Sequence, residues 1–244
     1  MNVHSISGNK LKIVLLAVSC VLMTACAHVP PTIAHTHIGH AITGFDGAPE
    51  EKGLFTVAEE RAQEIVKHAD AASRETNDLN SLKQHVQTVI DKTNSDEYGL
   101  RHSLEHAVRH IDFAANSVDA SANVKQAAPE IAAAAGEVLK RCDLIALLGS
   151  DVLATESLNE GQLLTEQIRQ LAQTNLSGGV AADGAGATEN GVIQVRARLD
   201  RMIDSENPPY VTVDRWYLFH LVRLPNCDSC WAWRKWANAS NRGY

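Results

Sequence analysis

Apolar residues recur every three or four positions along most of this chain. This spacing places them on one face of an α-helix, because a helix turns once every ~3.6 residues. Four such stripes hold Leu54, Ala58, Ala62, Ile65, Ala69 and Ala72; Leu79, Leu82, Val86, Val89 and Ile90; Leu100, Leu104, Ala107, Val108, Ile111, Ala115 and Val118; and Leu163, Leu164, Ile168 and Leu171. The alanine-rich stretch over 121–155 is expected to be helical, and residues 192–203 are expected to form a short helix. We therefore predict a helical bundle over residues 54–205.

The C-terminal part of the chain departs from this helical period. Residues 210–224 are rich in β-branched and aromatic side chains, which favours a strand. Residues 225–230 are typical of a turn, and 231–233 are expected to return as the second strand. A glycine-rich loop is predicted over 177–191, before the last helix. The predicted fold class is mainly α, a helical bundle with a C-terminal β-hairpin within 206–244.

The N-terminal segment carries a second signal. Lys10 and Lys12 precede a run of mostly apolar residues that ends just before Cys26. The run is too short for a membrane-spanning helix, which needs about 20 residues, and it has the length of the apolar part of a signal peptide. Because small residues and then Cys26 follow, residues 1–25 resemble the signal peptide of bacterial lipoproteins.

This resemblance implies that residues 1–25 are removed and that Cys26 is acylated, so that the lipid bilayer is a partner of the mature chain. Acyl chains hold a protein at the membrane without a spanning segment. Ala27 follows the cysteine, and by resemblance to enterobacterial sorting rules this favours the periplasmic face of the outer membrane. The alternative is a plain secreted protein with an incidental cysteine at this position.

Charge and composition limit what the mature chain can bind. Removal of residues 1–25 leaves 219 residues and takes away two lysines, so the net charge changes from −7 to −9. An acidic chain is a poor partner for nucleic acid, which requires a basic surface. Prolines and glycines are frequent over residues 26–53 and no period is sustained there. We therefore expect this segment to be a flexible tether that contains histidines.

Eleven histidines are the main chemical lead, and most of them are grouped. His102, His106 and His110 are spaced by four in a predicted helix, which places them in a stripe roughly opposite its apolar face. Histidines one helical turn apart can bind one divalent ion, and neutral imidazole suits Cu(II), Ni(II) and Zn(II). The second candidate group is in the predicted tether and consists of His35, His37 and His40. The alternative for both groups is an ordinary solvated surface. His85 is expected as a core histidine, and His68 has no predicted role.

Short phrases around these histidines resemble the repeats of small periplasmic metal-binding helical proteins. They are Glu105 to His110, Val66 to Ala69 and His37 to Ala41, within residues 35–118. Proteins of that kind are four-helix bundles with pairs of histidines one turn apart that take up copper and other divalent ions. The resemblance implies metal binding for this chain, and His102, His106 and His110 match the pair spacing best.

The cysteines predict structural roles. Cys142 is in an apolar helical stretch and is expected to be a buried thiol. Cys227 and Cys230 are expected to form a disulfide that clamps the C-terminal turn in an oxidising compartment. A redox pair or half of a zinc site are the alternatives. Trp231 follows the pair where haem attachment requires histidine, so no haem is expected.

No catalytic motif is recognisable, so we predict a protein that is not an enzyme. The leading hypothesis is a membrane-anchored envelope lipoprotein that binds divalent transition-metal ions as a buffer or carrier. The alternative is a structural or assembly lipoprotein whose surface contacts another envelope protein. A third hypothesis is thiol redox work by Cys227 and Cys230.

Overall fold

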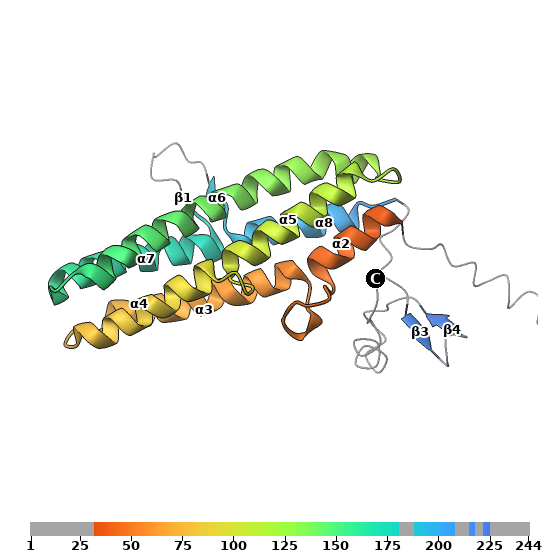
Figure 1. Ribbon diagram of the computed structural model, residues 1–244. Coiled ribbons are helices and arrows are strands. Elements are labelled where there is room, and N and C mark those ends of the chain that lie inside the picture. Colours follow the sequence, from red (N-terminus) through yellow and green to blue (C-terminus); the bar gives the residue numbers. More distant parts are fainter. Residues whose placement is uncertain (1–31, 181–187, 208–214, 218–221, 225–244) are drawn as a thin grey trace, which may run out of the picture. The chain divides into compact units, whose positions relative to one another are not determined.

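A computed structural model describes residues 32–180, 188–207, 215–217 and 222–224 of the chain. These residues are mainly helical (Figure 1). The elements in chain order are α2 (Ile33–Ile42), the 3-10 turn η1 (Pro49–Glu51), α3 (Leu54–Arg74), α4 (Leu79–Asn94), α5 (Leu100–Asn116), α6 (Ala122–Ala154), α7 (Leu158–Ser177), β1 (Gly179–Val180), β2 (Thr188–Glu189), α8 (Val192–Asp204), β3 (Arg215–Tyr217) and β4 (Val222–Leu224). The helices expected between 54 and 205 are confirmed, with ends that differ by a few residues.

The helices pack because their apolar stripes face one another. Helix α3 packs against α4, α5 and α7, and α6 packs against α4, α5, α7 and α8. The fully buried side chains of these stripes form one continuous core. Its largest members include Phe55, Ile65, Leu104, Ile145 and Leu199. None of the helices in the described residues has the length and apolarity needed to cross a membrane.

Helix ends follow the side chains that cap them. Ser121 starts α6 by accepting a hydrogen bond at Oγ from the Val124 amide, at 3.0 Å. Ser157 starts α7 in the same way, with the Glu160 amide as donor to its Oγ at 3.3 Å. Pro129 lies inside α6. Because Ser121 already caps α6, Pro129 does not mark the start of the helix.

The prediction of a flexible tether over residues 26–53 is wrong for residues 33–42. Residues 33–42 form α2, and α2 packs on α5. Ala34, Ile38 and Ala41 make a short apolar stripe that is buried in the core. Thr32 caps the helix, since its Oγ accepts a hydrogen bond from the His35 amide at 3.0 Å. A capped amphipathic helix that buries its stripe is ordered by packing despite the prolines and glycines around it.

The predicted C-terminal β-hairpin is also wrong. It required one strand over 210–224 that pairs with 231–233. Instead β3 and β4 are three residues each and pair with each other, with Trp216 opposite Arg223, inside the stretch predicted as a single strand. The fold of the described residues is therefore helical, with only such short strand pairs. The expected second strand at 231–233 lies outside the described residues.

The predicted glycine-rich loop over 177–191 has ordered ends. Gly178 has a φ of 72°, a left-handed conformation that glycine adopts without strain and that ends α7. Then β1 pairs with β2, with Gly179 opposite Glu189. The buried Arg141 of α6 donates to the Asn175 side chain at 2.7 Å and to the Asn190 carbonyl. These bonds fix both ends of the loop on the bundle.

Candidate metal centre

Three histidines from two helices meet at one point of the bundle. His37 and His40 come from α2, and His110 comes from α5. One ring nitrogen of each lies within 4.8 Å of the other two. The His37 and His110 Nδ1 atoms are 3.2 Å apart, and the His40 and His110 ring centroids are 4.9 Å apart. This histidine cluster joins two members of the predicted tether group, His37 and His40, to one member of the predicted helix group, His110.

The docking of α2 on α5 brings the cluster together. His37 and His40 are one helical turn apart and lie beside the buried stripe of α2, so they face α5 along its edge. Asp119, just after α5, fixes the start of α2. Its carboxylate accepts hydrogen bonds from the Ile33 amide at 2.6 Å and the Ala34 amide at 3.1 Å. A carboxylate at this position also interacts favourably with the positive end of the helix dipole.

Two phenylalanine rings border the histidine cluster. The Phe45 centroid lies 5.5 Å from His40 and 5.2 Å from His110, and the Phe113 centroid lies 5.4 Å from His37. This setting partly shields the imidazoles from water. Burial, with the neighbouring His40 and His37 rings, lowers the pKa of His110 to about 4. A neutral imidazole is the form that binds a metal ion.

The same cause acts on the other two members of the cluster. Burial lowers the pKa of His37, although Asp119 acts in the opposite direction. Burial and then the His37 ring lower the pKa of His40. The His40 Nδ1 atom is buried and has no hydrogen-bond partner among the described residues. An unsatisfied buried polar atom is uncommon in a folded protein, and in this cluster a metal ion is a suitable partner for it.

The spacing of the ring nitrogens is close to what one ion requires. Zinc binds imidazole nitrogen at ~2.0–2.1 Å in tetrahedral geometry, which separates two ligand nitrogens by about 3.4 Å. The His37 and His110 Nδ1 atoms are already near that separation at 3.2 Å. All three nitrogens lie within 4.8 Å of one another, so ring rotations that move a nitrogen by about 1–1.5 Å complete a three-ligand site. Three ligands leave the fourth position of the ion open.

The other predicted ligands lie outside this cluster. His102 and His106 stack on each other, with ring centroids 4.1 Å apart and planes at 16°, and His102 also contacts Tyr98. The predicted histidine stripe of α5 is therefore divided. Its C-terminal member, His110, turns to α2, whereas the other two pair along the helix.

His35 is placed in a different network. It is buried, and its Nε2 lies 3.1 Å from a carboxylate oxygen of Glu206, just after α8. The Ser121 hydroxyl and the Asn123 amide each donate to the other oxygen at 2.6 Å. Burial acts to raise the pKa of Glu206, but these hydrogen bonds outweigh it and lower that pKa. His35 thus ties α2 to the end of α8 and is not a member of the metal site.

A further histidine pair was missed by the sequence analysis. His68 of α3 and His85 of α4 face each other, with their Nδ1 atoms 3.4 Å apart. The prediction of His85 as a core histidine is wrong, since the side chain is only partly buried. The two residues lie equally far from the segment 75–78 that connects their helices. In an antiparallel helix pair such positions lie opposite each other, and this symmetry was the available signal.

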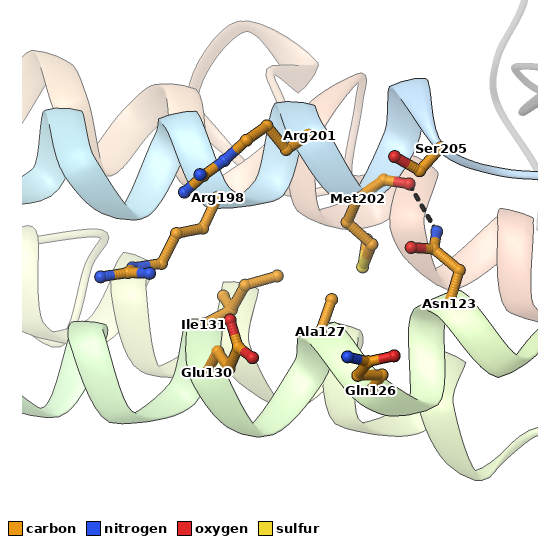
Figure 2. A pocket seen from close by; sticks show the side chains of 9 residues that line it. All are labelled: Asn123, Gln126, Ala127, Glu130, Ile131, Arg198, Arg201, Met202 and Ser205. Atoms are coloured by element: carbon orange, nitrogen blue, oxygen red, sulfur yellow. Dashed lines mark hydrogen bonds between the residues drawn. The ribbon is translucent and has the colours of Figure 1, made fainter.

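A separate pocket of about 290 Å³ lies between α6 and α8 (Figure 2). Its polar lining includes Arg198 and Arg201 on one wall and Glu130 on the other. At one end Asn123 donates to the Met202 carbonyl at 2.7 Å, which links the two helices. No histidine lines this pocket, so it plays no part in the metal chemistry considered above.

Comparisons of the chain with family models, with curated proteins and with solved structures gave no match. Cys26, Cys227 and Cys230 lie outside the described residues. Cys142 is fully buried with a free thiol, which confirms its predicted role.

Proposed function

We propose that this protein binds a divalent transition-metal ion at His37, His40 and His110. The observation that carries the proposal is the convergence of three ring nitrogens, from two helices, within 4.8 Å. The low pKa values of the imidazoles support it, because neutral rings do not have to lose a proton before they bind. Zn(II), Cu(II) and Ni(II) are the ions that fit a cluster of imidazole ligands.

The proposed role is that of a metal buffer or carrier. Three protein ligands leave one coordination position for water or for a ligand from another molecule. An ion held in this way can be exchanged with a partner, whereas an ion with four protein ligands is enclosed. We propose no reaction at this site.

A zinc titration of the mature full-length chain, purified in detergent without a polyhistidine tag, tests the site. His110→Ala removes the one ligand of the cluster that comes from α5, which lies beside both His37 and His40 of α2. We expect the Kd for zinc to rise by more than about tenfold, since even outer-shell changes cost about 10–100-fold. The matched control is His102→Ala on the same helix, which should change the Kd by less than about threefold. Equal affinity in the wild type and the His110 variant would refute the proposal.

The proposed location is the periplasmic face of the outer membrane, with an acyl anchor on Cys26. The order of basic residues, apolar run and cysteine in the sequence supports this. Cys20 is the other cysteine of the N-terminal segment and serves as the control. Cells fed an alkyne-labelled palmitate should label the wild-type chain and the Cys20→Ser variant, but not the Cys26→Ser variant. Label that remains after loss of Cys26 would contradict the anchor, and a labelled chain in the inner-membrane fraction would contradict the sorting.

A further inference from the structure

His68 and His85 bring two ring nitrogens close together between neighbouring helices, an arrangement that the apolar packing of a helix hairpin does not require. The rings come from adjacent helices α3 and α4, which lie alongside each other (Figure 1). Their Nδ1 atoms are 3.4 Å apart, and the ring planes are tilted by 43° with centroids 5.6 Å apart. The two nitrogen atoms, and not the two ring faces, are therefore the closest polar groups of the pair.

The Nδ1 separation matches one metal geometry better than another. Two imidazole nitrogens on a tetrahedral ion, each ~2.0–2.1 Å from it, lie about 3.4 Å apart. Ligands at right angles, as in a square-planar Cu(II) site, would lie only about 2.9 Å apart at the same bond length. The observed 3.4 Å is close to the tetrahedral value of Zn²⁺, and without an ion it corresponds to one N–H···N hydrogen bond between the rings.

The charged groups around the pair decide whether a third protein ligand is available. Glu64 lies one turn before His68, but its carboxylate is bound by Arg61 at 2.8 Å and by Lys92 at 2.9 Å. It is therefore committed to two cations and does not complete the site. Burial, followed by the charges of His85 and Lys67, lowers the pKa of His68, so this ring is neutral near pH 7.

We propose that His68 and His85 bind a second zinc ion through their Nδ1 atoms, with water in the remaining positions. This site is separate from the histidine cluster and shares no residue with it. With two protein ligands instead of three, it binds zinc more weakly than the cluster. The protein then takes up more than one ion, which suits a buffer, and the second ion joins α3 to α4.

The test is a zinc titration of the full-length chain without a polyhistidine tag, by calorimetry. Wild type should show a tight and a weak class of site. His68→Ala should abolish the weak class and leave the tight class, while His110→Ala should do the reverse. A weak class that survives His68→Ala, or that disappears in His102→Ala instead, overturns the inference. If the wild type shows the weak class of site but no tight class, the proposed function is refuted and this second site still stands.

A second measurement separates binding from an indirect effect on folding. In the 15N-labelled protein, zinc should shift the Nδ1 resonances of His68 and His85 and leave both rings protonated at Nε2. The His68→Ala variant should keep the wild-type circular dichroism and unfolding temperature, because the side chain is only partly buried. Coordination through Nε2, or no change at either ring, would contradict the proposed geometry.

Discussion

At the scale of single residues, burial separates histidines that are identical in the sequence. The packing of α2 on α5 and two phenylalanine rings partly shield three imidazoles from water, those of His37, His40 and His110. Their pKa values are lowered by this burial. The spacing rule grouped His110 with His102 and His106, whereas in the fold its ring meets His37 and His40 of α2. A periodic pattern reports which face of a helix a residue occupies, and it does not report which helix covers that face.

The lowered pKa values predict how zinc binding depends on pH. Three free imidazoles with a pKa near 6.5 would weaken binding by about 50-fold between pH 7.5 and pH 6, through competition with protons. Because His110 has a pKa of about 4 and those of its neighbours are also lowered, we expect a much smaller loss over this range. Zinc titrations at both values in a non-coordinating buffer measure it. A loss of 50-fold or more would show that these rings are solvated.

Glu206 offers a test of the network around His35. Glu206→Gln removes the charge that accepts hydrogen bonds from Ser121, Asn123 and His35, and should lower the free energy of unfolding by about 1–3 kcal/mol at pH 7. The exposed Glu130→Gln is the matched control and should change it by less than about 0.5 kcal/mol.

The pH dependence of that difference follows from the sign of the pKa shift. The pKa of Glu206 is lower in the folded chain than its ordinary value of 4.5, so the carboxylate stabilises the fold above pH 4.5. As the pH falls below 4.5 the contribution is lost. The gap between wild type and Glu206→Gln in chemical denaturation should therefore narrow in acid, and a gap that widens would contradict the network.

At the scale of elements, α2 is the part that sequence analysis could not place. Its stripe of Ala34, Ile38 and Ala41 is short and made partly of small residues, and three histidines interrupt it. Such a helix is not stable alone and forms because α5 covers it. The longer helices were predictable, because their stripes extend over four or more turns and carry larger side chains.

The turn between α2 and α3 should tolerate no side chain at Gly53. An added Cβ would lie 2.7 Å from the Ile42 Cα and closer still to the Ile42 carbonyl group, which is backbone and cannot rotate away. We expect Gly53→Ala to destabilise the fold by about 1–3 kcal/mol and to weaken zinc binding by displacing α2.

Gly136→Ala is the matched control for that substitution. An added Cβ at Gly136, within α6, has no atom within 4 Å. Alanine should therefore stabilise the helix by about 0.5–1 kcal/mol. Urea unfolding and zinc titration of both variants measure these effects. Equal stability of the two variants would mean that the α2–α3 turn adjusts freely.

At the scale of the whole molecule, the histidine cluster connects residues that are 73 positions apart in the chain, as in the pair of His37 and His110. Contacts of this separation depend on the packing order of the helices, which no local pattern contains. Sequence analysis therefore predicted the helical class and most helix positions. It did not predict the convergence of the two histidine groups, and its strand pairing at the C-terminus was wrong.

An ion that binds only the folded chain must stabilise the whole of it. At a free zinc concentration of about 100 times the Kd the gain is about 2.7 kcal/mol, which raises the Tm of a protein of this size by about 5–10 °C. The His110→Ala variant should show little of this rise under the same conditions. Thermal unfolding followed by circular dichroism provides the comparison, and equal shifts in both proteins would mean that zinc acts elsewhere.

Because Cys142 is buried, the reactivity of its thiol reports how often the helices around it separate. Burial raises the pKa of this thiol to about 12, and the Asn175 amide lies against its sulfur at 3.6 Å. A thiol-specific reagent needs the thiolate and a free path to it. It can therefore react with Cys142 only in molecules whose α6 and α7 have separated. The labelling rate of this sulfur therefore measures how often α6 and α7 separate. Zinc should slow the labelling where this separation requires the whole fold to open, because neither proposed zinc site includes a residue of α6 or α7.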